Sequence, residues 1–137
     1  MSAAVVKPLA SFTVAVDPDE VRAFAEALGL PASPTPPPTF AIRFLFHPAA
    51  RAALSAFTPA DGTLPIHIGQ RFRYHRPLRL GETLCCALGA APAEDGRPFA
   101  LVRLELTSLA GEAVCQAESE IAMAAPGFTW TQRSEAR

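Results

Sequence analysis

The sequence predicts an α+β domain in which one curved antiparallel sheet wraps around a long central helix. Three observations predict it. A capped amphipathic helix follows an early strand, a strongly apolar segment occupies residues 39–57, and the hydrophobic period changes to two in the second half of the chain. A sheet with one apolar face must bury that face, and the apolar segment is available to cover it.

Size and composition indicate a single domain of 137 residues, half of them hydrophobic. We expect this domain to span residues 1–137, with a core at about 11–124 and a tail at 125–137. The net charge of −1 offers no basic excess for nucleic acid or an anionic membrane. No apolar run approaches the roughly 18–20 residues that a membrane-spanning helix needs.

Three cysteines, Cys85, Cys86 and Cys115, are too few and wrongly spaced for a disulfide framework or a zinc site. The count is odd, and two of the cysteines are adjacent. We therefore expect reduced thiols, no bound metal and a cytoplasmic protein.

The first elements have clear boundaries. Residues 11–16 alternate and predict a strand, and residues 17–29 predict a helix. Asp17 can cap that helix, Pro18 suits its first position, and Gly29 supplies its end. Its apolar face is predicted to comprise Val21, Phe24, Ala25 and Leu28.

A proline-rich connector at 31–38 separates this helix from the apolar segment. Proline lacks an amide donor and restricts the residue before it, so the connector should be extended and stiff. Residues 39–57 then predict a mostly buried helix with Thr39 as its N-cap. Pro48 should kink or split this helix near His47, because it removes a backbone hydrogen bond.

Four antiparallel strands are predicted near residues 66–76, 82–94, 97–109 and 112–124, with a hairpin turn at Gly111 joining the last two. Strict alternation places five residues of the first of these strands on one face: His67, Gly69, Arg71, Arg73 and His75. On the last strand, alternation turns Val114 away from the core and Cys115 towards it.

Four sequence segments, in this order, resemble the MaoC-like dehydratase/hydratase family, and most closely its N-terminal-type domain with a hot-dog fold. They are VDPDEVRAFAEALG, PPTFA, IHIGQRFRYHRPLRLGETL and VRLELTSLAGEAVCQAESEIAM. Together they cover roughly residues 11–124, which is most of the chain.

The resemblance implies a function in acyl-thioester chemistry. Hot-dog domains of this kind pair edge to edge, and they bind acyl chains carried on coenzyme A or acyl carrier protein without another cofactor. The implied enzyme is an (R)-specific enoyl-CoA hydratase or 3-hydroxyacyl dehydratase of fatty acid metabolism. Its Asp and His lie on the segment before the central helix, whose free amides stabilise the developing enolate oxygen.

One departure from the family bears directly on catalysis. The interval that should hold the Asp and His is only LPASPTP, and it contains no Asp, Glu, His or Asn. Three explanations stay open: a non-catalytic, acyl-binding subunit that pairs with a catalytic MaoC-like one; an active homodimeric enzyme with catalytic groups from elsewhere; or a hot-dog thioesterase.

Two histidines are candidates for catalysis, His67 at the start of a strand and His47 at the helix break. The simpler interpretation of His47 is a residue that caps or packs at that break. Asp61 most simply belongs to a turn, although its carboxylate could serve a thioesterase. Arg43, on the apolar helix, needs an acidic partner such as Glu105, or must reach solvent.

Candidate substrate-binding residues follow from two ideas. The start of the central helix should meet the thioester, and glycine on a strand allows close approach of a ligand. The arginines could bind phosphates of coenzyme A or an acidic carrier protein, although a solvated basic face is the simpler interpretation. The predicted set is Thr39, Phe40, Gly69, Gln70, Arg71 and Arg73.

Overall fold

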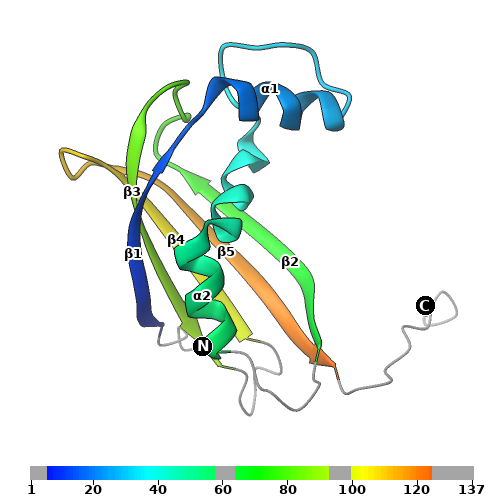
Figure 1. Ribbon diagram of the computed structural model, residues 1–137, viewed down its shortest axis with the longest axis vertical. Helices are drawn as coiled ribbons and strands as arrows, with labels where there is room; N and C mark the ends of the chain where they lie inside the picture. Colours follow the sequence, from blue (N-terminus) through cyan, green and yellow to red (C-terminus); the bar gives the residue numbers. More distant parts are fainter. Residues whose placement is uncertain (1–5, 58–63, 93–99, 125–137) are drawn as a thin grey trace, which may run out of the picture.

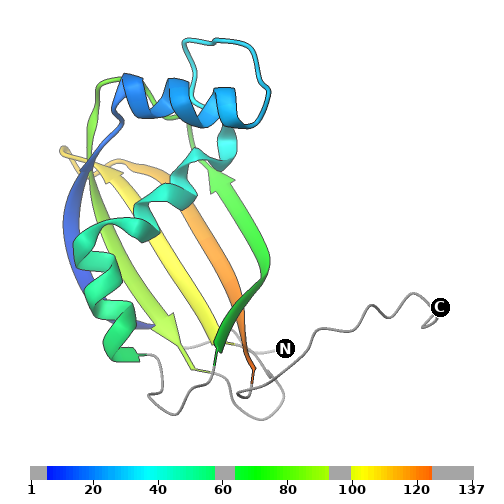
Figure 2. The same cartoon turned by 45° about the vertical axis from the view of Figure 1, so that its right-hand side comes forward.

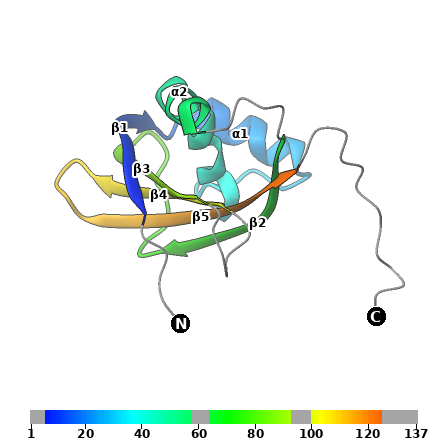
Figure 3. The ribbon, with the colours of Figure 1, turned by 90° about the horizontal axis from the view of Figure 1, so that it is seen from below.

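The computed structural model describes residues 6–57, 64–92 and 100–124. This part forms one antiparallel sheet with its helices on a single side (Figures 1 and 3). The predicted α+β class and all predicted strands are confirmed, with ends shifted by a few residues. The elements are β1 (Lys7–Ala15), α1 (Pro18–Ala27), η1 (a 3₁₀ helix, Pro38–Phe46), α2 (Pro48–Phe57), β2 (Leu64–Tyr74), β3 (Thr83–Ala91), β4 (Ala100–Ser108) and β5 (Ala113–Ala124).

The sheet has the order β1-β3-β4-β5-β2, so β1 and β2 form its two edges. Its helix-facing side supplies most of the core, including Leu84, Leu88, Leu104 and Leu106, all with almost no exposed surface. Strand β4 buries Ala100, Val102, Leu104 and Leu106, which alternate along it. No helix of the described residues is long and apolar enough to cross a membrane.

Helix α1 begins and ends as predicted. The Asp17 side chain accepts a hydrogen bond of 2.8 Å from the Asp19 amide, which satisfies one of the free donors of the first turn. Gly29 follows the helix with a φ of 73°, a left-handed conformation that glycine adopts without strain. The prediction for Leu28 is wrong, because α1 ends before it and its side chain is 54% exposed.

The predicted central helix is split at Pro48 into η1 and α2, as expected from the missing amide. Two expectations for this segment are wrong. Pro37, not Thr39, occupies the N-cap position, and no side chain caps η1. Only Ala50 is buried among the described side chains of α2, because this helix contacts the β1 edge rather than the middle of the sheet.

The central helix crosses the sheet diagonally (Figure 2). At one end, the Tyr74 hydroxyl of β2 donates a hydrogen bond to the carbonyl of Pro38, the first residue of η1. At the break between η1 and α2, His47 stacks on Phe12 of β1, with ring centroids 4.4 Å apart. The helix therefore runs from the end of β2 across to β1, which α2 contacts, and in Figure 2 no helix lies above the first half of β2.

The β4–β5 hairpin turns at Gly111, with a φ of 92°, as predicted. Its register contains a bulge: Leu106 pairs with Cys115 and Thr107 pairs with Ala113, so Val114 has no partner. The prediction that Val114 faces away from the core is wrong, since the bulge turns it inwards and it is fully buried.

Candidate functional site

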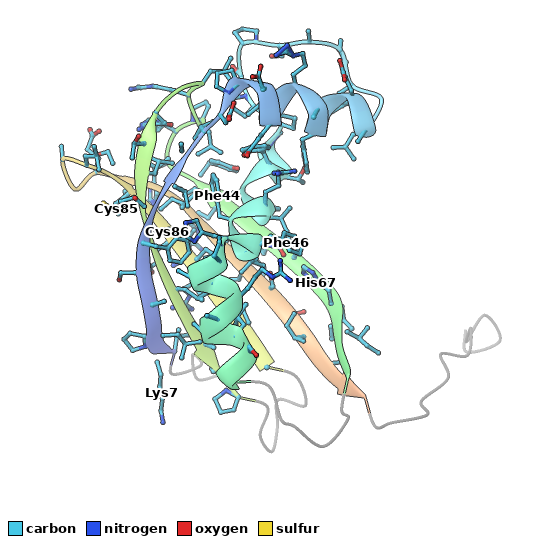
Figure 4. The ribbon with its side chains drawn as sticks, in the orientation of Figure 1. Lys7, Phe44, Phe46, His67, Cys85 and Cys86 are labelled. Carbon is cyan, nitrogen blue, oxygen red and sulfur yellow. The ribbon has the colours of Figure 1, made fainter. Side chains whose placement is uncertain are left out.

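A bulge in β2 decides where His67 lies. His67 pairs with Ile121 of β5, whereas Gly69 pairs with Glu120, which leaves Ile68 unpaired. Directly opposed residues of neighbouring strands share a face, so His67 joins Ile121 on the helix-facing side. The prediction that His67 shares a face with Gly69 is therefore wrong. In Figure 4 the labelled His67 lies on the side of β2 towards the helices.

A polar pair lies near His67 on the same face of the sheet. Gln70 is paired with Ser119 across β2 and β5, and the Ser119 hydroxyl lies 2.5 Å from Gln70 Oε1, to which it donates. Ser119 is the buried polar residue of the described core. Gln70 Nε2 is also buried and has no hydrogen-bond partner among the described residues. Unpaired buried donors are costly, so this amide has spare capacity for a ligand or a water molecule.

The arginines of β2 lie on the opposite, outer face. Arg71 is 3.3 Å from one oxygen of Glu118 and 3.7 Å from one of Glu120. Glu118 is shared with Arg103 of β4, at 2.7 Å. These pairs form a ladder of alternating charge across three strands, so Arg71 is largely neutralised. Arg73 is exposed beside them on the same face, away from His67 and Gln70.

The predicted residues of the central helix are not brought together with His67. Thr39 is exposed, while Phe40 is fully buried and packs edge-on against Phe24 and Phe44. His47 accepts a 3.0 Å hydrogen bond from the Ala49 amide through Nδ1, which caps the start of α2. In this geometry His47 caps and packs at the helix break, which is the simpler of the two interpretations of its sequence position.

Arg43 reaches solvent and approaches Glu20 of α1 at 4.0 Å. Its guanidinium also lies 5.9 Å from the centre of the Phe40 ring. The predicted partner, Glu105, instead accepts a hydrogen bond from Gln116. Asp61 lies outside the described residues.

A pocket of about 990 Å³ lies where the proline-rich connector passes between α1 and the end of β2. We call it the connector pocket. Its walls are one face of α1, residues 30–33 and 35–38 of the connector, and residues 74–78 and 80 at the β2–β3 turn. Apolar side chains dominate these walls, among them Val21, Ala25, Leu30, Leu78 and Leu80.

The charged groups around the connector pocket are mostly paired. Arg76 binds both carboxylate oxygens of Glu82, at 2.8 and 3.1 Å, and Arg22 pairs with Asp19. Partial burial alone would raise the pKa of Glu82. The hydrogen bonds from Arg76 and from the Arg79 amide outweigh burial and hold that pKa below its ordinary value.

The Tyr74 phenol is held neutral at this pocket. Burial, with a smaller contribution from Cys115, raises the pKa of Tyr74 well above its usual value. The neutral phenol is fixed as a donor to the Pro38 carbonyl. Tyr74 therefore fastens the connector to the sheet and does not act as a base at ordinary pH.

The described residues offer little acid–base chemistry. No ion pair joins a histidine to a carboxylate within this part of the chain. The same residues contain no group of three potential metal ligands. Burial raises the pKa of the Cys86 thiol to about 12 and also raises that of Cys115, so neither is a ready nucleophile.

No protein-family model matches the chain. Among solved structures, it resembles the HadBC (3R-hydroxyacyl-ACP dehydratase) complex of Mycobacterium tuberculosis, with a TM-score of 0.64 and 17% identity over 86% of this chain and 95% of that one. It also resembles R-hydratase PhaJ1 of Pseudomonas aeruginosa, with a TM-score of 0.58 and 18% identity over 98% and 92% of the two chains. The chain has the hot-dog fold. The fold expected from the sequence is thus confirmed, with dehydratases and R-hydratases among its structural neighbours.

Curated relatives carry only the description UPF0336 protein. The relative from Saccharopolyspora erythraea is 31% identical over 99 residues, which are 71% of this chain and 63% of the relative. The relative from Thermobifida fusca is 33% identical over 89 residues, 65% and 50% of the two chains. This hot-dog chain therefore spans between half and two thirds of the curated relatives that it matches. Two of its structural neighbours, HadBC and the ChsH1–ChsH2 complex of M. tuberculosis, are complexes.

Sequence reasoning missed the connector pocket and Ser119. The alternation of β5 places Ser119 on the same face as Cys115, but it does not indicate that Ser119 would hydrogen-bond to Gln70 of β2. The proline-rich connector was the available signal for the pocket, because a stiff segment beside an amphipathic helix cannot collapse onto it.

Proposed function

We propose that this chain is a hot-dog subunit that binds acyl thioesters and completes the active site of a catalytic partner of the enoyl-CoA hydratase or 3-hydroxyacyl dehydratase type. One observation carries the proposal. The connector supplies apolar walls and no acid or base: residues 30–36 hold only Leu, Pro, Ala, Ser and Thr. Hydration of an enoyl thioester requires a group that moves a proton at a pKa near the working pH.

The rest of the chain has features that suit a binding role. The helix-facing side of β2 carries Gln70, whose buried Nε2 has no partner in the part of the chain that the structure describes. Strand β2 is an edge strand among the described residues, and its outer edge can continue the sheet into a second subunit. The heteromeric neighbours support a catalytic hot-dog subunit as that partner, and free cysteines in the described residues fit a cytoplasmic setting.

The test is a reconstitution assay with crotonyl coenzyme A, followed by loss of the enoyl absorbance. The purified chain alone should show no turnover. Addition of a MaoC-like subunit that carries the Asp and His segment should give turnover well above that of the added subunit alone. The proposal is contradicted if this chain leaves the activity of that subunit unchanged.

A second candidate, autonomous hydration by a homodimer, is favoured by the position of His67. The bulge at Ile68 turns His67 to the face of the sheet that carries Gln70 and Ser119. Turnover by the chain alone that is lost in His67→Ala, with Ser55→Ala on the exposed side of α2 as the control, would favour this candidate. Release of free thiol from a saturated acyl coenzyme A would instead indicate a thioesterase.

A further inference from the structure

The free edge of β2 carries a short row of cations. Figure 1 shows β2 at one edge of the sheet, and no described strand pairs with its far side. Arg71 and Arg73 lie on the outer face of this strand, opposite Glu118 and Gln116 of β5, and both are exposed. We call these two arginines the outer row of β2. An edge strand offers backbone donors and acceptors to a further strand, so the outer row lies where such a strand would dock.

The charge of this part of the chain has one sign. Residues 62–81 contain four arginines and no Asp or Glu. Arg71 has carboxylate partners inside the chain, because it lies 3.3 Å from Glu118 and 3.7 Å from Glu120. None of the ion pairs among the described residues includes Arg73. Arg73 is therefore a cation whose charge remains available at the edge.

The other edge of the sheet differs in charge. The residues of β1 that alternate with its buried side chains are Ser11, Thr13 and Ala15, which are exposed and uncharged. The one charged residue of β1 is Lys7, at its first position. Helix α2 also contacts β1. Charge complementarity can therefore select a partner at the β2 edge, whereas β1 lacks a comparable row.

A second copy of this chain is a poor match for the β2 edge. Two identical strands would pair about a two-fold axis, with opposed residues on the same face. Strand β2 contains no acid, so no register places one of its own carboxylates opposite Arg71 or Arg73. Registers centred near the outer row instead place arginine opposite arginine, and like charges that face each other across strands are destabilising.

We infer that the outer row of β2 selects a partner subunit whose edge strand carries Asp or Glu at the opposed positions, and that it disfavours pairing with a second copy. This inference rests on the proposed function, because it gives the chemistry by which the catalytic partner is recognised. Arg73 provides most of the attraction, since Arg71 already shares its charge with Glu118 and Glu120. Rejection of like charge and attraction of opposite charge together give specificity.

A charge-reversed copy of the same chain is the probe, because it keeps the backbone of the edge and changes its charge. Arg71→Glu/Arg73→Glu presents an acidic outer row. Arg73→Glu is a second variant, which retains the ion pairs of Arg71. Arg51→Glu makes the same change of sign at an exposed position of α2, which contacts β1 and η1, so it is the matched control. Fluorescently labelled parent chain is titrated with each unlabelled chain, and sedimentation velocity measures their association.

We expect the double variant to bind the labelled parent on the order of tenfold more tightly than the unlabelled parent does. This gain should shrink as the ionic strength rises from about 0.05 M to about 0.5 M, because salt screens exposed charges. Arg73→Glu should give a smaller gain and Arg51→Glu none. Thermal melts check the fold of each variant, and Arg73→Glu decides the outcome if the double variant is unstable.

Three results would overturn the inference. They are self-association of the parent as tight as its binding to the charge-reversed chains, an equal gain with Arg51→Glu, and no association in any mixture. The reconstitution assay decides the proposed function separately. Stimulation of a catalytic subunit in that assay, without a charge effect in this one, would leave the proposed function in place and remove the role of the outer row.

Discussion

The hydroxyl of Tyr74 donates a hydrogen bond to the carbonyl of Pro38, which joins the last residue of β2 to the first residue of η1. Because η1 has no side-chain cap, this bond is a specific polar tie at the start of the central helix. It also forms one corner of the connector pocket. A single phenol thus connects the sheet edge, the helix and the proline-rich connector.

Tyr74→Phe should lower the free energy of unfolding by about 1 kcal/mol, because it removes this bond and leaves a carbonyl without its donor. Urea denaturation followed by circular dichroism measures the change. Ser55→Ala, at an exposed position of α2, serves as the control. Equal stability of Tyr74→Phe and the parent chain would show that the tie contributes nothing.

Glu82→Gln should destabilise the protein by about 2 kcal/mol near neutral pH, since the Glu82 carboxylate accepts two hydrogen bonds from Arg76 and one from the Arg79 amide. Glu20→Gln is the control, because Glu20 is half exposed and 4.0 Å from Arg43. Urea midpoints of the two variants at neutral pH make the comparison.

The Glu82 effect should depend on pH in a defined direction. The folded-state pKa of Glu82 lies below the unfolded one, so its stabilisation is fully present above the unfolded value of about 4.3. As the pH falls from there through the folded pKa, that stabilisation is lost. The difference between Glu82→Gln and the parent should therefore shrink on acidification. A gap that stays constant down to pH of about 2 would contradict the assignment.

Two strand glycines should differ in their tolerance of alanine. A Cβ on Gly89 would lie 2.5 Å from the Val6 side chain and 3.1 Å from the Lys7 carbonyl oxygen, so strand β1 must shift. A Cβ on Gly69 would lie 2.7 Å from the carboxylate of Glu120, the far end of a side chain that can rotate away. We expect Gly89→Ala to cost about 1–3 kcal/mol and Gly69→Ala clearly less, measured by thermal melts. A larger loss of stability in Gly69→Ala than in Gly89→Ala would contradict the close approach of β1 to Gly89.

The cysteines should react unequally in the folded protein. Cys85 is partly exposed, whereas Cys86 and Cys115 are buried with raised pKa values (Figure 4 labels Cys85 and Cys86). At about pH 8, a thiol-specific disulfide reagent should label Cys85 first and the buried pair only on unfolding. Peptide mapping by mass spectrometry identifies the labelled residue. Fast labelling of Cys86 in the native protein would mean that strands β1 and β3 separate readily from the core.

Much of the fold followed from periodicity and from residues with special backbone chemistry. Asp17 and Gly29 mark the ends of α1, Pro48 marks the break in the central helix, and Gly111 marks the last hairpin. The burial of α2 could not be predicted, because its alanines suit either a core or a half-covered surface. Contact with the edge strand, which is a tertiary property, decided the outcome.

The candidate site was less predictable because it depends on register. Alternation alone cannot reveal a bulge, since the apolar residues Ile66 and Ile68 match the expected pattern whether or not one residue is left unpaired. The pairing of Arg71 with Glu118 joins residues on different strands and likewise required the sheet order. In contrast, the lack of an acid or base in residues 30–36 was readable from the sequence directly.

Because Ile68 is unpaired, the face to which His67 points depends on how the residues of β2 are paired and not on their identity. Regular pairing of Ile68 with Ile121 would remove the bulge, restore strict alternation and turn His67 to the outer surface without any change at the histidine itself. Comparisons between this chain and its relatives should therefore count residues between His67 and Gln70 before they compare the residues. An imidazole at an aligned position can lie on the helix-facing side of the sheet in one protein and on the outer side in another.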